Sequence, residues 1–223
     1  MPDERINSGP TVGPPVGPTA GPTVARWGPV SSAAAPVLLI GGWTLAAAVQ
    51  RGGFDQVRDT ISALAGLGAD HRWLMTVALT AVGCCHLATA AALRPAPAAG
   101  RLVLGLGGAA TWGVAAFPLP VEGGSTAHTL CAAVAFGSLA VWPALGRVPG
   151  DAAERADRPA PLRLPVRLAA ATTLIGLVGW FAAELVAEGP RLGLAERVAA
   201  GAQALWPLAV VLGAAGSLVA RRR

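Results

Sequence analysis

The segment Trp73–Leu93, WLMTVALTAVGCCHLATAAAL, carries no charged side chain, and this decides the fold class of the chain. An α-helix rises ~1.5 Å per residue, so about 20 residues cross the ~30 Å hydrocarbon core of a bilayer. Further runs of similar length are almost free of charge, with Glu184 as the exception: residues 31–50, 102–121, 128–146, 168–187 and 198–220. The sequence therefore predicts an all-α polytopic bundle of six transmembrane helices.

The overall composition supports a membrane protein. Hydrophobic residues make up 53% of the chain and charged residues 13%, whereas about 25% of an average soluble domain is charged. A soluble protein of this size with so little charge would have too few polar side chains to cover its surface. The composition therefore excludes an ordinary soluble domain.

The chain divides into three parts. Residues 1–30 contain seven prolines, which exclude a long helix, so we predict a disordered, Pro/Gly-rich cytoplasmic tail. Residues 31–220 form the predicted six-helix transmembrane domain. Residues 221–223 are three arginines that form a basic C-terminal end.

The distribution of arginine predicts the orientation. All 17 basic residues are arginine, and a cytoplasmic N-terminus would leave only five of them outside: Arg51, Arg58, Arg72, Arg191 and Arg197. Because basic residues favour cytoplasmic loops, we expect both termini in the cytoplasm and a multi-pass protein of the plasma (inner) membrane. This charge is a topology signal, so we expect membrane lipid as a partner and no nucleic acid.

Acidic residues favour the opposite side of the membrane. The outer loops and outer helix ends hold seven of them, together with two histidines: Asp55, Asp59, Asp70, Glu122, Glu184, Glu188, Glu196, His71 and His128. Carboxylates and imidazoles at one membrane boundary could bind a cation, hold a lipid headgroup or activate water. The alternative is that short outer loops simply need polar residues.

A short helix is expected in the first outer loop, over Asp59-Thr-Ile-Ser-Ala-Leu-Ala-Gly66. Asp59 is a good N-cap residue, and Ile61 and Leu64 share one face at a spacing of three. The helix would lie at the membrane surface with this apolar face down, and Ser62 would lie close to Asp59.

We predict a ligand-binding site formed by Asp59, Ser62, His128 and Glu184, which lie at similar outer depth and come from three different hairpins. Glu184 is the strongest candidate of the four, because an ionisable group inside a membrane span costs free energy. The alternative is a structural role, in which the Glu184 carboxylate reaches the water at the membrane surface or pairs with Arg191 or Arg197.

His86 lies deep in the second span, where a haem ligand is conceivable. Paired haem ligation needs a second histidine at similar depth, and His128 is at the outer boundary, so we predict no cofactor. No Cys/His cluster has zinc spacing, so we predict no metal. His86 is then expected to make a hydrogen bond between helices, and Gln203 is a candidate for a contact of the same kind.

Small residues and prolines mark the expected helix contacts. Gly105 and Gly108 in the third span, and Gly176 and Gly179 in the fifth, should allow close helix packing. Trp142-Pro143 and Trp206-Pro207 should kink the fourth and sixth spans.

Several segments resemble the family of bacterial six-helix membrane proteins called domain of unknown function 998. The resemblance covers about residues 30 to 220. It rests on Phe54-Asp-Gln-Val-Arg-Asp-Thr-Ile-Ser62, Trp73-Leu-Met75, Phe117-Pro-Leu-Pro120 before His128, Gly193-Leu-Ala-Glu-Arg197 and Gln203-Ala-Leu-Trp-Pro207. It implies a six-helix plasma-membrane protein and supplies no activity.

The function that we expect is the binding or handling of a lipid or other small amphiphile at the outer leaflet, without committed catalysis. One alternative is a membrane-embedded hydrolase that uses outer Asp, Glu and His residues. Another is a structural or assembly partner of envelope proteins. The sequence leaves the oligomeric state open.

Overall fold

The computed structural model describes residues 23–146 and 158–220, and the regular structure in these ranges is all helical, which confirms the all-α prediction. The long helices of the described chain are α1 (Gly28–Ala48), α3 (Trp73–Ala92), α4 (Ala98–Ala116), α5 (Thr126–Val141), α7 (Leu164–Val186) and α8 (Leu192–Ala220). Its short elements are α2 (Ile61–Leu64) and the 3₁₀ helices η1 (Trp142–Ala144) and η2 (Ala160–Leu162).

The predicted borders differ slightly from the helix ends. Helix α1 begins at Gly28 with Pro29 in its first turn, so residues 28–30 of the predicted tail are helical. Residues 1–22 of that tail and the basic end 221–223 lie outside the described residues. Helix α4 covers 98–116 rather than 102–121, because Pro118 and Pro120 cannot continue a helix.

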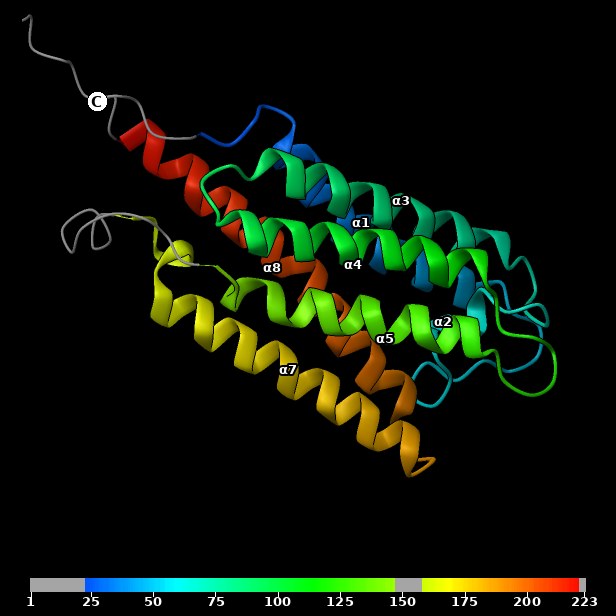
Figure 1. The fold of residues 1–223 in the computed structure, drawn as a ribbon. Coiled ribbons are helices and arrows are strands. Elements are labelled where there is room, and N and C mark those ends of the chain that lie inside the picture. The colour runs from blue at the N-terminus through cyan, green and yellow to red at the C-terminus, as the bar shows by residue number, and fades with distance from the viewer. Residues whose placement is uncertain (1–22, 147–157, 221–223) are drawn as a thin grey trace, which may run out of the picture.

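The long helices form a ring in which each packs on the next (Figure 1). α1 contacts α3, α3 contacts α4, α4 contacts α5, α5 contacts α7, α7 contacts α8, and α8 returns to α1. The small helix α2 contacts α1 and α8 at one end of the ring. We call this the α2 end; η1 and η2 lie at the opposite end.

Five helices of the described chain are long and apolar enough to cross a membrane: α1, α3, α5 together with η1, α7, and α8 as far as Gly216. Large apolar side chains such as Val77, Leu102 and Val186 are exposed on the bundle, as expected where lipid surrounds a protein. Helix α4 has 19 residues, but its five glycines and Arg101 lower its mean hydropathy, so the sixth predicted span is not among these five.

Glycines bring α3 and α4 into close contact. A Cβ added to Gly83 would lie 2.7 Å from the Gly108 carbonyl oxygen, and one added to Gly108 would lie 2.8 Å from that of Gly83. This confirms the predicted packing role of the glycines in α4. Gly176 and Gly179 of α7, by contrast, have no atom of the described chain within 4 Å of an added Cβ, so their predicted packing role within one chain is wrong.

Helix α2 is shorter than predicted, and Asp59 does not cap it. Its cap is Thr60, whose Oγ1 accepts a hydrogen bond from the Ala63 N–H at 3.0 Å. The Asp59 carboxylate instead accepts from the Asp55 N–H at 2.8 Å. The loop before α2 uses the carboxylate for its own turn, which leaves the capping position to the next residue.

Arg167 of α7 holds the end of α5 at the side opposite α2. Its guanidinium is buried and donates from Nε to the Pro143 carbonyl at 2.7 Å, and from Nη2 to the carbonyls of Leu145 at 2.7 Å and Gly146 at 3.0 Å. Pro143 lies in η1, and Leu145 and Gly146 follow η1, so one arginine satisfies three carbonyls of the segment that follows α5. Pro143 was predicted to kink a longer helix, but α5 ends at Val141 and continues as η1. Pro207 lies inside α8 as expected.

Replacing Arg167 by lysine should lower the melting temperature of the purified protein in detergent, by the equivalent of about 1–3 kcal/mol. A single ammonium cannot reproduce the planar fork that reaches these carbonyls. The matched control is Arg163→Lys, since Arg163 is the exposed N-cap residue of α7 and its Nε donates to the Arg158 carbonyl at 3.0 Å. Equal melting temperatures for the two variants would contradict the assigned role of Arg167.

Candidate functional site

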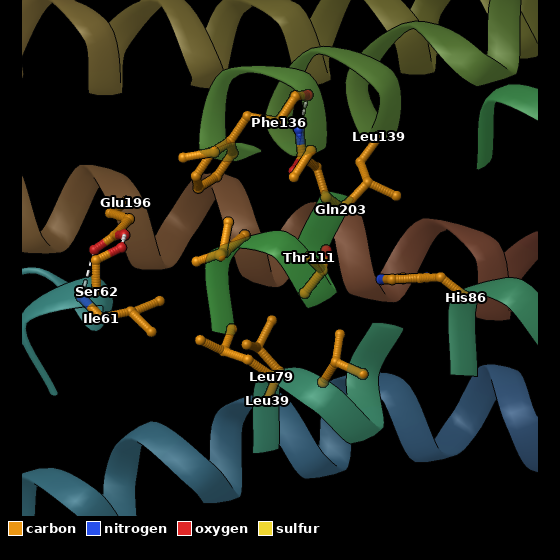
Figure 2. A pocket seen from close by; sticks show the side chains of 15 residues that line it. Leu39, Ile61, Ser62, Leu79, His86, Thr111, Phe136, Leu139, Glu196 and Gln203 are labelled. Carbon is orange, nitrogen blue, oxygen red and sulfur yellow. Dashed lines mark hydrogen bonds between the residues drawn. The ribbon is translucent and has the colours of Figure 1, made fainter. Parts of the chain in front are cut away.

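A cavity of about 60 Å³ lies inside the ring (Figure 2). Its walls come from α1, α2, α3, α4, α5 and α8 and are mostly apolar; they include Leu39, Leu79, Val82, Phe136 and Leu139. The polar lining residues are Ser62, His86, Thr111, Glu196 and Gln203. Figure 2 shows Glu196 and Ser62 at one end of the cavity and His86 at the other.

Glu196 forms the polar end of the cavity near α2. Its side chain is only 3% exposed, and its carboxylate accepts hydrogen bonds from the Ile61 N–H and from the Ser62 hydroxyl, the latter at 3.2 Å. Ile61 is the first residue of α2, whose N–H has no partner within the helix. The carboxylate of α8 thus completes the helix that covers this end of the cavity, and it is stabilised by the N–H groups pointing at it.

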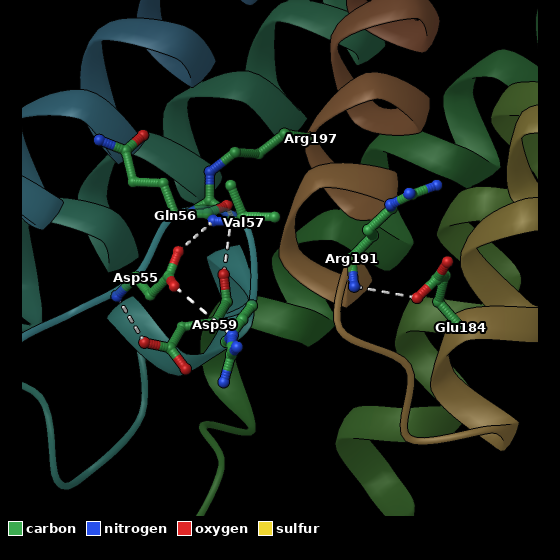
Figure 3. Close-up of polar contacts among 8 residues, drawn as sticks. Asp55, Gln56, Val57, Asp59, Glu184, Arg191 and Arg197 are labelled. Atoms are coloured by element: carbon green, nitrogen blue, oxygen red, sulfur yellow. Dashed lines mark hydrogen bonds and ion pairs between the residues drawn. The ribbon is translucent and has the colours of Figure 1, made fainter.

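Arg197, the next residue, ties the loop before α2 to α8 (Figure 3). Its Nη1 donates to three backbone carbonyls: Gln56 at 2.8 Å, Asp59 at 2.7 Å and Gly193 at 2.9 Å. Its guanidinium carbon lies 5.5 Å from the centre of the Phe54 ring, within the range of a cation–π contact. A single buried cation therefore orders the backbone of residues 54–59.

The same loop provides partners for the first turn of α8. The Gly193 N–H donates to the Arg58 carbonyl at 3.2 Å, and the Leu194 N–H donates to the Val57 carbonyl at 2.9 Å. The backbones approach so closely that a Cβ on Gly193 would collide with the Asp59 carbonyl. Glycine is therefore required at this position. We call Gly193, Glu196 and Arg197, with the loop 54–62 that they hold, the clamp.

The middle of the cavity carries amide and hydroxyl groups that already have partners. Gln203 Nε2 donates to the Phe136 carbonyl of α5 at 2.8 Å, and Thr111 Oγ1 donates to the Gly107 carbonyl at 2.8 Å. Gln203 thus makes the polar contact between helices that was expected of it. His86 does not: it is 1% exposed, and its Nδ1 has no hydrogen-bond partner among the described residues.

The four residues predicted to form one site are separated in the structure. Ser62 lines the cavity. Asp59 lines a different, open groove of about 390 Å³ on the surface of the α2 end, which Asp70 and Leu119 also line. His128 is buried, and its Nδ1 pairs with the Phe117 carbonyl at 2.8 Å.

Glu184 has partners on its own side of the bundle. It accepts from Trp180 Nε1 at 3.2 Å and from the Arg191 N–H at 3.0 Å (Figure 3). The contact with Arg191 is made by its backbone N–H, and the expected pairing of the two charges is not found among the described residues. Asp59, His128 and Glu184 are not among the residues that line the cavity, so the expected convergence of four side chains is wrong. Whether any of the four binds a ligand stays a prediction.

Sequence reasoning placed Glu196 in a loop, because the last span was expected to begin at residue 198. The helix begins at Leu192, which brings Glu196 and Arg197 into its first turns. The signal was available: Gly193-Leu-Ala-Glu196-Arg197 follows Gly189-Pro190 directly, and residues after such a break commonly start a helix. Partners for these two side chains, however, come from a loop 130 residues away.

The chain belongs to a known family. The model of the family described as "Protein of unknown function (DUF998)" matches residues 32–213, a range that contains the cavity and the clamp. Neither a comparison with curated proteins nor one with solved structures found a match.

Replacing Gly193 by alanine should destabilise the protein, because the methyl group forces the loop carbonyl of Asp59 away from α8. We expect a loss of about 1–3 kcal/mol as these hydrogen bonds open. Gly176→Ala in α7 is the matched control, since an added Cβ meets no atom there within 4 Å. That variant should be neutral or gain ~0.5–1 kcal/mol from helix propensity. Melting temperatures in detergent measure both, and a neutral Gly193→Ala would refute the clamp.

Proposed function

We propose that this member of the DUF998 family crosses the plasma membrane six times, with both termini in the cytoplasm. The sixth span is α4, which packs between α3 and α5 and is ~28 Å long at ~1.5 Å per residue. Its Arg101 lies near one helix end and donates from Nε to the Ala90 carbonyl at 2.7 Å, so the charge need not face lipid. Because arginine favours the cytoplasmic side of a membrane protein, the α2 end, which has fewer arginines, faces the outside of the cell.

This topology predicts the labelling of single cysteines in a background without Cys84, Cys85 and Cys131. In intact cells, a membrane-impermeant maleimide should label Gly52→Cys and Gly124→Cys at the α2 end. It should label Ala98→Cys and Ala160→Cys, which are exposed at the opposite end, only after the cells are opened. Labelling of Ala98→Cys in intact cells would reverse the orientation.

We further propose that the cavity binds a small amphiphile taken from the outer leaflet. The observation that carries this proposal is the pair Ser62 and Glu196 at one end of a mostly apolar cavity. Apolar walls with a few convergent polar groups are typical of small-molecule sites. An O–H or N–H group of the ligand would donate to the Glu196 carboxylate, and its apolar part would lie against Leu39, Val82 and Phe136.

Helix α2 is the natural gate for such a ligand. It has four residues, and its contacts with the long helices are those with α1 and α8. Its first N–H is held by Glu196, so a ligand group that bonds to the carboxylate competes with the bond that keeps α2 in place.

The geometry favours binding over the two alternatives. A hydrolase would need a base beside a nucleophile, but the His128 imidazole is bound to the Phe117 carbonyl and the Glu184 carboxylate to Trp180 and Arg191. Glu196 lies beside Ser62, where it also serves as the acceptor for the α2 backbone. A purely structural partner would not require a cavity with buried polar groups.

The binding proposal predicts that 1-decanol stabilises the protein in lipid nanodiscs and that decanoate does not, because the second carboxylate would face Glu196. Ligand at 100 times its Kd adds ~2.7 kcal/mol of stability, which a melting curve detects. In the Glu196→Gln variant, the stabilisation by 1-decanol and that by decanoate should differ less than in the unaltered protein.

The control is Ala135→Leu, which fills the cavity from α5 while leaving both polar groups in place. This variant should lose the response to decanol. An equal shift in Ala135→Leu and in the unaltered protein would mean that decanol acts through the bilayer, and the proposal would be wrong.

A further inference from the structure

His86 is the one titratable lining residue of the cavity, as far as the structure describes it, that has no hydrogen bond. The side chain is 1% exposed, and in Figure 2 it reaches into the cavity from α3. An imidazole ring always carries at least one donor or acceptor that needs a partner. A buried polar group without one is costly, and such exceptions call for a bound group that completes them.

The distance between the two ends of the cavity follows from helix geometry. Both α3 and α8 start at the α2 end; His86 follows Trp73 by 13 positions and Glu196 follows Leu192 by four. At ~1.5 Å per residue, the two side chains lie roughly 14 Å apart along the bundle. Figure 2 shows them at opposite ends.

The cavity volume agrees with this separation. A water-sized group occupies about 10–15 Å³ by this measure, so about 60 Å³ holds about four to six such groups. Arranged in single file with ~2.8 Å between neighbours, these groups would form a row ~11–17 Å long. An extended chain advances ~1.2 Å per bond, so an apolar segment of about ten to fifteen carbons spans the same length.

We propose that the ligand carries a hydrogen-bonding group at each end of such an apolar segment, one for Glu196 and Ser62 and the other for His86. This inference rests on the proposed amphiphile binding and adds the chemical class of the ligand. Between the two ends the walls are apolar, and the polar groups of Thr111 and Gln203 already bond to carbonyls of Gly107 and Phe136. The middle of the ligand is therefore apolar and its two ends are polar.

Glu196 is the charged residue that lines the cavity near α2. Arg197, the next residue, does not line the cavity and donates from Nη1 to carbonyls of the loop. Around His86, the helices α1 and α4 present Leu39, Thr111 and Val114 to the cavity, and none of these is charged. A neutral terminal hydroxyl therefore suits the His86 end. An apolar tail end there would leave the imidazole without a partner.

The test is a competition between 1-decanol and 1,10-decanediol for the intact protein, read by native mass spectrometry from detergent micelles. The ratio of bound diol to bound decanol is compared between the unaltered protein and His86→Phe. Because both ligands partition into the micelle identically in the two samples, this comparison cancels partitioning. We expect the ratio to be about two- to tenfold higher in the unaltered protein, as for one buried hydrogen bond.

Two further variants sharpen the result. Thr111→Val, which alters a lining hydroxyl already bonded to Gly107, should keep the ratio of the unaltered protein, and His86→Gln should restore part of it. If His86→Phe does not fold, the length of the ligand is varied instead, on the unaltered protein. 1,10-Decanediol should outcompete 1-decanol. 1,6-Hexanediol is too short to reach both ends of the cavity and should show no advantage over 1-hexanol.

The outcomes separate the two proposals. Binding of decanol with no diol preference, or a preference that survives in His86→Phe, overturns the bipolar ligand and leaves amphiphile binding intact; water would then satisfy His86. Absence of binding by either alcohol overturns both proposals.

Discussion

The rest of the structure at the α2 end depends on one constraint, which is that Glu196 and Arg197 are buried in the first turns of α8. Burying a charge is costly unless it is paired or fully hydrogen-bonded. The loop 54–62 meets part of that requirement with its backbone, while Arg197 Nε and Nη2 have no hydrogen-bond partner among the described residues. Its carbonyls accept from Arg197, and its N–H and hydroxyl groups donate to Glu196. Glu196 therefore holds the hydrogen-bond donors of this loop, and Arg197 holds its carbonyl groups.

This clamp also shapes the cavity. By holding Ile61 and Ser62 against α8, Glu196 keeps α2 over the end of the space inside the ring. The helices around that space supply short or branched apolar side chains, so the cavity is apolar along its length and polar where Glu196 and His86 lie. In the proposed binding mode, structure and binding would share a residue: the carboxylate that holds α2 is also the acceptor that we propose for the ligand. Binding and local opening are expected to be coupled for this reason.

The separation of Asp59, His128 and Glu184 has a common physical cause. Each of these side chains finds a hydrogen-bond partner no more than 11 residues away along the chain: the Asp55 N–H, the Phe117 carbonyl, and Trp180 with the Arg191 N–H. Similar depth in the membrane brought them to the same level of the bundle. Residues at the same level of the bundle can still lie at different positions around the ring, and these three do.

The sequence by itself determined the helices, since uncharged runs of about 20 residues have few other solutions in a membrane, and it also predicted that glycines of α4 allow close helix packing. It placed Gly193, Glu196 and Arg197 in one short motif and Phe54 to Ser62 in another, and identified both as marks of the family. Only the tertiary structure decided that these two motifs meet, that Thr60 rather than Asp59 caps α2, and that His86 faces a cavity. Local patterns specify what a helix is, whereas the partners of a buried charge are chosen by the rotation and register of helices that are far apart in the chain.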